Sequence, residues 1–250
     1  MTKKQKETAT PATDLPATPI RQDDHHTLIS PLDGNRVYLK NTQTTKAKYD
    51  YDVVILGAGP AGEAAAMKLA KSGKKVVVVD PRGQVGGNCA HVGTIPSKVL
   101  RQSVFNIINM RRDPLFSQVI DRHQVPLKHV LSKARQVIMN QVATHTLFYE
   151  RNQVEVIHGW GSFVDKHTLS IEPTSKEEDA HRTITFDSAV IAVGSRPYRP
   201  DILDFNHPRV FDSDKILQMD YLARKIIIYG AGVIGCEYAS IFIGLYHKVD

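Results

Sequence analysis

Apolar residues are grouped along the chain in patterns that predict an α/β fold. Residues 52–56 and 75–79 contain continuous apolar runs, which are typical of strands buried in a parallel sheet. Residues 63–71, between the two runs, have the character of a helix. Residues 119–150 predict a second, longer helix, because their apolar side chains recur near a 3.6-residue period. The pattern therefore begins with a strand–helix–strand unit.

Shorter segments follow in which apolar and polar residues alternate, and they predict a β-meander. The four segments are 154–157, 162–164, 168–171 and 183–186. Residues 189–193 form another apolar run and predict a buried strand that ends in a glycine turn at Gly194. Residues 225–229 predict one more strand. We therefore expect a parallel sheet with a meander, followed by the start of a second unit.

Residues 1–50 differ from the rest of the chain, because they are rich in Thr, Pro, Asp and Lys and show no sustained helix or strand period. Such a composition is typical of a disordered segment, and we expect an N-terminal tail that is disordered or loosely packed. Residues 51–224 are expected to form one domain. Residues 225–250 are expected to form the start of another.

A glycine motif directly follows the first predicted strand, with Gly57, Gly59 and Gly62. In dinucleotide-binding proteins the first glycine makes a tight turn, the second lets the backbone approach a pyrophosphate, and the third lets helix and strand pack closely. A tight strand-to-helix turn would by itself also explain these glycines. Asp80 ends the next predicted strand, where a carboxylate can accept hydrogen bonds from ribose hydroxyls. This acid and the buried strand favour dinucleotide binding.

The same glycine spacing recurs after the predicted strand 225–229, at Gly230, Gly232 and Gly235. Residues beyond Gly232 predict a helix, so the order strand, glycine turn, helix is repeated. Two such units imply two dinucleotides, one of which can be a flavin dinucleotide.

Residues 86–98 read Gly-Gly-Asn-Cys-Ala-His-Val-Gly-Thr-Ile-Pro-Ser-Lys. Pro96 fits the first turn of a helix that runs to about Arg111, because a missing N–H costs nothing there. Cys89 can be a small buried residue or an active-site residue. Cys89 and His91 are too few ligands for a metal site, and we expect none. Lys98 can be a solvated charge on the helix.

This segment, together with the two glycine motifs, resembles the flavoprotein disulfide reductases. In that family two cysteines, five positions apart, form a redox disulfide against the flavin. Cys89 stands at the first of these positions and Thr94 at the second. A hydroxyl group cannot form a disulfide, so the dithiol chemistry of the family is not expected here.

The resemblance implies FAD in the first glycine unit and NAD(P) as a substrate in the second. It assigns these residues to the cofactor sites: Gly57, Gly59, Gly62, Asp80, Arg82, Gly87, Lys98, Gly194, Gly230, Gly232 and Gly235. It assigns Cys89, Thr94, Lys98 and Glu237 to the catalytic site. Lys98 and Glu237 are expected to pair beside the flavin, where low dielectric would let a held ammonium stabilise negative charge.

With Thr94 in place of a cysteine, the resemblance implies FAD-dependent hydride transfer between NADPH and NAD+. Two alternatives stay open: a dihydrolipoamide dehydrogenase-like disulfide reductase, which Thr94 opposes, and a non-catalytic nucleotide-binding fragment. The sequence stops near the second strand of the second unit, so we expect it to represent the N-terminal half of an enzyme. The resemblance further implies a homo-oligomer formed through a C-terminal domain.

Composition narrows the class of protein. The chain has 250 residues, 42% hydrophobic and 23% charged, with a net charge of +6, which is typical of a soluble globular protein that meets anionic small molecules. Nucleic acid is not an expected partner, because no Lys/Arg cluster with interleaved aromatics occurs. The most apolar window, 53–70, contains Glu63 and Lys68, so no membrane span is expected. Two cysteines favour a reducing cytoplasm over a disulfide framework.

Overall fold

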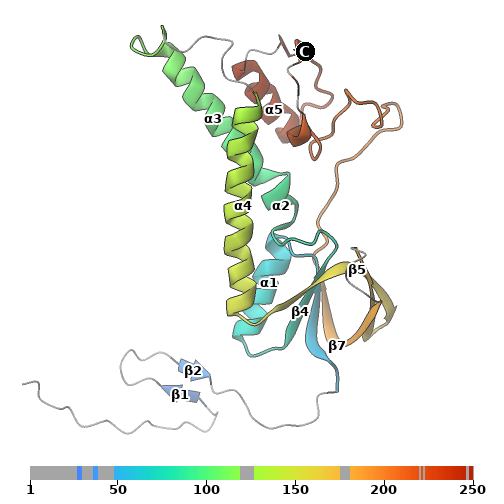
Figure 1. Ribbon diagram of the computed structural model, residues 1–250. Coiled ribbons are helices and arrows are strands. Elements are labelled where there is room, and N and C mark those ends of the chain that lie inside the picture. Colours follow the sequence, from blue (N-terminus) through green and yellow to red (C-terminus); the bar gives the residue numbers. More distant parts are fainter. Residues whose placement is uncertain are drawn as a thin grey trace, which may run out of the picture. The chain divides into compact units, whose positions relative to one another are not determined.

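Figure 1 shows the computed structural model of the chain. It describes residues 27–29, 36–38, 48–118, 127–174, 181–219, 221, 223–245 and 248–249. The chain divides into two units, Met1–Ala47 and Lys48–Asp250. In the described ranges no helix is long and apolar enough to cross a membrane.

The described residues of the first unit form a pair of short strands. β1, Thr27–Ile29, pairs antiparallel with β2, Arg36–Tyr38, so that Leu28 lies opposite Val37. These strands lie within the predicted N-terminal tail. Residues 48–50 of the predicted tail belong instead to the second unit, where Asp50 accepts the Thr185 N–H at 2.8 Å. The remaining tail residues, 1–26, 30–35 and 39–47, lie outside the described residues.

The second unit is built on a parallel sheet. β3, Tyr51–Leu56, lies between β4, Val76–Asp80, and β7, Arg182–Ile191, and β5, Glu155–Asp165, pairs with the far side of β4. α1, Pro60–Lys71, connects β3 to β4. The predicted strand–helix–strand unit and the parallel sheet are therefore confirmed.

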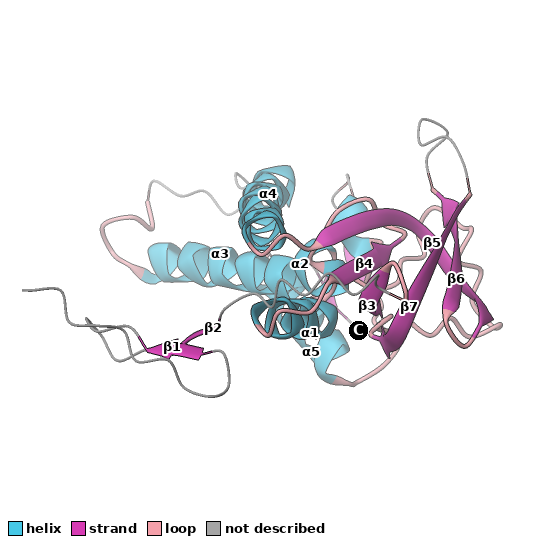
Figure 2. Ribbon diagram, turned by 90° about the horizontal axis from the view of Figure 1, so that it is seen from below, coloured by secondary structure: helices cyan, strands magenta, loops and turns pink. Residues whose placement is uncertain are grey.

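Both faces of β3 are covered, which explains its continuous apolar run. Val53 and Ile55 pack with Ala66 of α1, whereas Val54 and Leu56 face the other way and pack with β6 and β7. Figure 2 shows the helices on one side of the sheet and β6 on the other. Successive side chains of a strand point to opposite faces, so each face of β3 contributes to a different core.

The meander closes the sheet into a barrel. β5 and β7 extend beyond the parallel sheet and pair antiparallel with β6, Thr168–Pro173, so that the order β3-β4-β5-β6-β7 forms a closed ring. The meander prediction is confirmed, but its division into short strands was wrong. Residues 155–157 and 162–164 belong to one long strand, and so do residues 183–186 and 189–191, because β5 and β7 each continue while their partner strand changes.

Two predicted strands differ in extent or burial. Residues 189–193 were expected to be a buried strand, but β7 ends at Ile191, and Ile191 and Val193 are 67% and 70% exposed. At this end β7 pairs with β3 alone among the described strands, because β6 pairs only with residues 182–185 of β7. The strand predicted at 225–229 is shorter than expected. It is β8, Lys225–Ile226, which pairs with β9, Lys248–Val249, over only two residue pairs.

Three further helices pack together beside the sheet (Figure 1). α3, Thr94–Arg112, contacts both α4, Leu127–Arg151, and α5, Val233–Gly244. The shared core consists of Leu100, Val104, Val130, Leu131, Ala134, Met219, Tyr238, Ile241 and Phe242. The predicted helices are thus confirmed, although residues 119–126 lie outside the described residues. A short helix that was not predicted, α2, Gly87–His91, precedes α3.

Candidate functional site

The first glycine motif forms a turn from β3 into α1 at the carboxyl end of the sheet. Gly57 has a φ of +105°, and its N–H donates to the Val79 carbonyl oxygen at 2.8 Å. A Cβ atom on Gly62 would lie 1.9 Å from the Gly57 carbonyl oxygen, so the fold itself requires Gly62. A Cβ on Gly59 would meet only the Gly87 Cα atom, at 3.8 Å. The fold leaves space beside Gly59, where a phosphate-bearing ligand can approach.

The second glycine motif has the same local geometry. Gly232, before α5, has φ −75° and ψ 179°, and Gly59, before α1, has φ −77° and ψ −178°. A Cβ on Gly235 would lie 2.0 Å from the Gly230 carbonyl oxygen, whereas one on Gly232 would meet no atom within 4 Å. Neither helix start has a side-chain cap. First-turn N–H groups without a cap suit an anion, so both motifs fit a dinucleotide.

Asp80 ends β4 and is tied to the first glycine turn. Its Oδ2 accepts the Ala58 N–H at 2.7 Å, and its Oδ1 accepts the Arg82 N–H at 2.8 Å. The residue is only 8% exposed. A carboxylate has about four lone-pair sites, so these bonds leave room for ribose hydroxyls. The predicted ribose contact stays a prediction, and the structure adds a role in holding the turn.

Asn88 connects two loops at this edge of the sheet. The Arg82 guanidinium donates to Asn88 Oδ1, and Asn88 Nδ2 donates to the Ser195 carbonyl oxygen at 2.8 Å. Gly87 lies against the glycine turn, because a Cβ on it would be 2.7 Å from Gly59 Cα. The structure thus brings Arg82 and Gly87 to the first motif and links them to the turn that follows Gly194. Asn88 was not identified as a site residue from the sequence, because a single asparagine between Gly87 and Cys89 belongs to no recognisable motif.

The residues at the disulfide positions of the family lie on successive helices. Cys89 is half-buried in α2, and Thr94 is the exposed first residue of α3. Cys89 and Cys236 are the two cysteines of the chain, and both are free. Between the two positions, burial lowers the pKa of His91, whose Nε2 lies 2.8 Å from the Val85 carbonyl oxygen. This segment therefore holds one thiol and no disulfide.

Lys98 and Glu237 meet as predicted. The Lys98 Nζ lies 2.6 Å from Glu237 Oε1, which joins the first turns of α3 to α5. The Lys98 side chain is 62% exposed and that of Glu237 is 17% exposed. The Lys98 ammonium is therefore largely open to solvent within the described part of the chain, and the expected low-dielectric surroundings stay a prediction for the protein with FAD bound. The catalytic role of the pair stays a prediction.

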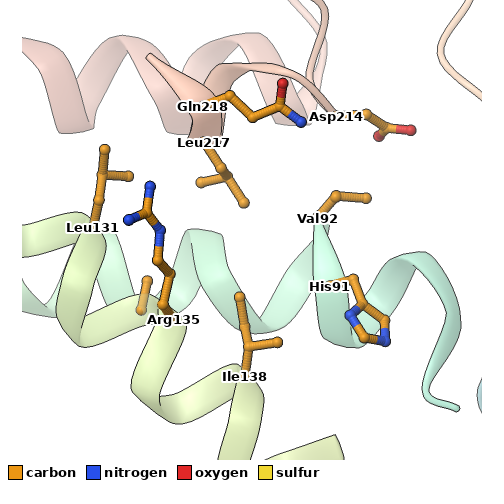
Figure 3. A pocket seen from close by; sticks show the side chains of 9 residues that line it. His91, Val92, Leu131, Arg135, Ile138, Asp214, Leu217 and Gln218 are labelled. Atoms are coloured by element: carbon orange, nitrogen blue, oxygen red, sulfur yellow. The ribbon is translucent and has the colours of Figure 1, made fainter. Parts of the chain in front are cut away.

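A separate pocket of about 190 Å³ lies between the end of α2, the helix α4 and residues 214–218. Figure 3 shows His91 and Val92 on one side and Arg135 extending from α4 toward the segment that carries Leu217. Its lining residues are His91, Val92, Leu131, Ala134, Arg135, Ile138, Asp214, Leu217 and Gln218. The residues predicted for the cofactor and catalytic sites do not line it.

Comparison with curated proteins finds close relatives. The chain is 53% identical over 204 residues to the soluble pyridine nucleotide transhydrogenase of Pseudomonas paraeruginosa, and this match covers 82% of the chain and 43% of that protein. The soluble pyridine nucleotide transhydrogenase of Azotobacter vinelandii is 52% identical over the same length and coverage. The chain thus spans less than half the length of the curated relatives it matches.

Among solved structures, the chain resembles the HOCl-induced flavoprotein disulfide reductase RclA from Escherichia coli. The TM-score is 0.66 at 25% identity, and the match covers 80% of the chain and 41% of that protein. The predicted α/β fold is confirmed by this likeness and by the parallel sheet itself. The model of the pyridine nucleotide-disulphide oxidoreductases matches residues 51–250. The chain therefore belongs to the pyridine nucleotide-disulphide oxidoreductase family.

Proposed function

We propose that the full-length protein transfers hydride between NADPH and NAD+ by means of bound FAD. The observation that carries this proposal is Thr94, which stands where a disulfide reductase needs its second cysteine, while Cys89 and Cys236 are both free. Relatives at about 53% identity are named soluble pyridine nucleotide transhydrogenase, which supports the same reaction. Thr94 opposes the alternative of a dihydrolipoamide dehydrogenase-like enzyme.

The first glycine motif is the proposed FAD site, within a domain of residues 51–224. Open space beside Gly59, the uncapped start of α1 and the guanidinium of Arg82 suit a pyrophosphate. Asp80 would accept hydrogen bonds from a ribose of this cofactor. Bound FAD would supply a two-electron acceptor and donor that the side chains of the chain lack. The second motif, in residues 225–250, would begin the NAD(P) domain.

Lys98 is the proposed source of positive charge beside the flavin. A fixed ammonium stabilises negative charge that develops on a cofactor, and it does so more strongly where water is excluded. Glu237 keeps this ammonium in place through the 2.6 Å contact. Since Glu237 lies five residues beyond Gly232, the pair links the two proposed nucleotide sites.

The test uses the full-length protein with NADPH as donor and NAD+ as acceptor. Steady turnover is expected, together with negligible reduction of lipoamide or glutathione disulfide. Lys98→Met should slow flavin reduction by about tenfold or more with little change in the dissociation constant of NADPH. Lys71→Met, at the exposed end of α1, is the matched control and should change neither. Disulfide reduction as fast as hydride transfer would contradict the proposal, and so would binding of both nucleotides without turnover.

Two further expectations remain predictions. A homo-oligomer is expected from the family resemblance, and sedimentation of the full-length protein tests it. A cytoplasmic location is expected from the low cysteine content, and cell fractionation tests it.

A further inference from the structure

Both oxygens of the Glu237 carboxylate are held by residues of α3. Oε1 lies 2.6 Å from Lys98 Nζ, and Oε2 lies 3.2 Å from Ser97 Oγ. Ser97 and Lys98 are consecutive in the first turns of α3, so one short stretch of helix contacts both carboxylate oxygens. Ser97 was not among the site residues predicted from the sequence.

The Ser97 hydroxyl has two acceptors within reach but only one proton to donate. It lies 3.2 Å from both the Thr94 carbonyl oxygen and Glu237 Oε2. The Thr94 carbonyl already has a partner in the helical pattern, the N–H four residues on. A hydrogen bond to a charged carboxylate is stronger than one to a neutral carbonyl. The bond to Glu237 is therefore the stronger of the two.

Ser97 is also the more rigid of the two donors. It is 4% exposed, and its N–H donates to the Gly93 carbonyl oxygen at 3.2 Å. The Lys98 side chain is 62% exposed and has four rotatable bonds. Exposed ion pairs hold their geometry weakly, because ordering a long side chain costs entropy. The buried serine therefore restricts the orientation of Glu237 in addition to the lysine.

We propose that Ser97 is a positioning residue, which holds the Glu237 carboxylate in the orientation that Lys98 binds. This inference rests on the proposed function in so far as the Lys98–Glu237 pair acts beside FAD. The hydroxyl would act through Glu237 and Lys98. Its removal should displace the carboxylate and leave the ammonium of Lys98 free to move.

The experiment compares Ser97→Ala, Ser97→Thr and Ser103→Ala in the full-length protein with FAD bound. Ser103 is the matched control, because it lies on the same helix, is 8% exposed, and its Oγ has no hydrogen-bond partner among the described residues. The first measurement is the Lys98–Glu237 distance in a crystal structure of each variant. The second is the rate of flavin reduction by NADPH, with the KM of NADPH.

In Ser97→Ala we expect the carboxylate to leave Lys98 and flavin reduction to slow by about tenfold, with KM unchanged within about twofold. Ser97→Thr should restore both the contact and the rate, and Ser103→Ala should alter neither. If Ser97→Ala does not fold, Ser97→Cys replaces it, since a thiol is a weak donor of similar size. An intact ion pair with an unchanged rate would overturn the inference, as would equal losses in Ser97→Ala and Ser103→Ala. The crystallographic distance is independent of hydride transfer, so failure of the proposed reaction would leave this test intact.

Discussion

At the scale of single residues, Gly59 and Gly62 should respond to alanine in opposite ways. Gly62→Ala places a Cβ 1.9 Å from the Gly57 carbonyl oxygen, which forces α1 away from the turn. We expect a loss of about 3 kcal/mol or more in the free energy of unfolding. Gly59→Ala meets nothing closer than 3.8 Å and should cost below about 1 kcal/mol. Urea unfolding of the two variants measures the difference.

The same pair of variants separates folding from cofactor binding. Gly59→Ala should weaken FAD binding by about tenfold or more, because its methyl group occupies the space proposed for the pyrophosphate. Titration of the apoprotein with FAD, followed by flavin fluorescence, measures the affinity. FAD affinity equal to that of the unchanged protein would place the flavin elsewhere.

Cys89 should be dispensable for hydride transfer, since Thr94 cannot join it in a disulfide. Cys89→Ser is expected to keep most of the NADPH-to-NAD+ rate, within about threefold. Reduction of the unchanged enzyme should produce no thiolate-to-flavin charge-transfer band in the visible spectrum. Cys236→Ser, at the exposed second cysteine, is the control. Near-complete loss of activity in Cys89→Ser alone would point to a thiol mechanism.

At the scale of helices, the crossing of α3 and α5 sets the position of Glu237. α5 approaches α3 closely at Gly244, where a Cβ would lie 2.3 Å from Val104 Cγ1 and 3.0 Å from Ile108 Cδ1. Gly244→Val should push the helices apart and cost about 1–3 kcal/mol of unfolding free energy. Because α5 carries Glu237, this change should also loosen the contact with Lys98. Urea unfolding measures the first effect.

A double-mutant comparison measures the second effect. Once Gly244→Val has separated the helices, Lys98→Met should slow flavin reduction less than it does in the unchanged protein. Ile243→Ala is the control, because Ile243 is the neighbouring residue and is 59% exposed. An undiminished effect of Lys98→Met in the Gly244→Val background would show that the pair does not depend on this crossing.

At the scale of the whole barrel, one polar cluster joins three strands. Tyr51 of β3 donates to Glu155 of β5, and Arg182 of β7 donates to Glu155 Oε1 at 2.6 Å and to the Tyr51 hydroxyl at 2.9 Å. Burial raises the pKa of Tyr51 to about 12, so its hydroxyl keeps the proton. Burial alone would raise the pKa of Glu155, but the hydrogen bonds from Tyr51 and Arg182 outweigh it and lower that pKa.

Because the pKa of Glu155 is lowered in the folded protein, the free energy of unfolding should fall as the pH becomes acidic. A carboxyl whose pKa is lower in the folded state contributes stability above its ordinary value of 4.5, and the contribution disappears as the pH falls through the folded value. The urea midpoint of the unchanged protein should therefore exceed that of Glu155→Gln at about pH 7, and the gap should narrow by about pH 3. Glu172→Gln, at an exposed position of β6, is the control. A gap that stays constant with pH would contradict the assignment.

The sequence by itself determined the features that depend on residues near one another. The turn at Gly57 and the packing at Gly62 involve atoms five residues apart, so steric limits on a short stretch are visible in the glycine spacing. The apolar run of β3 likewise predicted a strand buried on both faces. Thr94 excluded a disulfide without any coordinates, because the side chain lacks a sulfur atom.

Apart from the Lys98–Glu237 pair, which the family resemblance predicted, only the tertiary structure decided which distant groups share a contact. β5 and β7 each change their partner strand at midlength. The hydrophobic pattern changes at the same point, so the sequence alone predicted two short strands in place of each long one. Ser97 reaches Glu237, and Asn88 reaches Ser195, because helices and loops far apart in sequence are packed together. The exposure of Lys98 likewise depends on what covers α3. Such contacts follow from the packing of whole elements, whereas the sequence pattern carries only the preferences of each element.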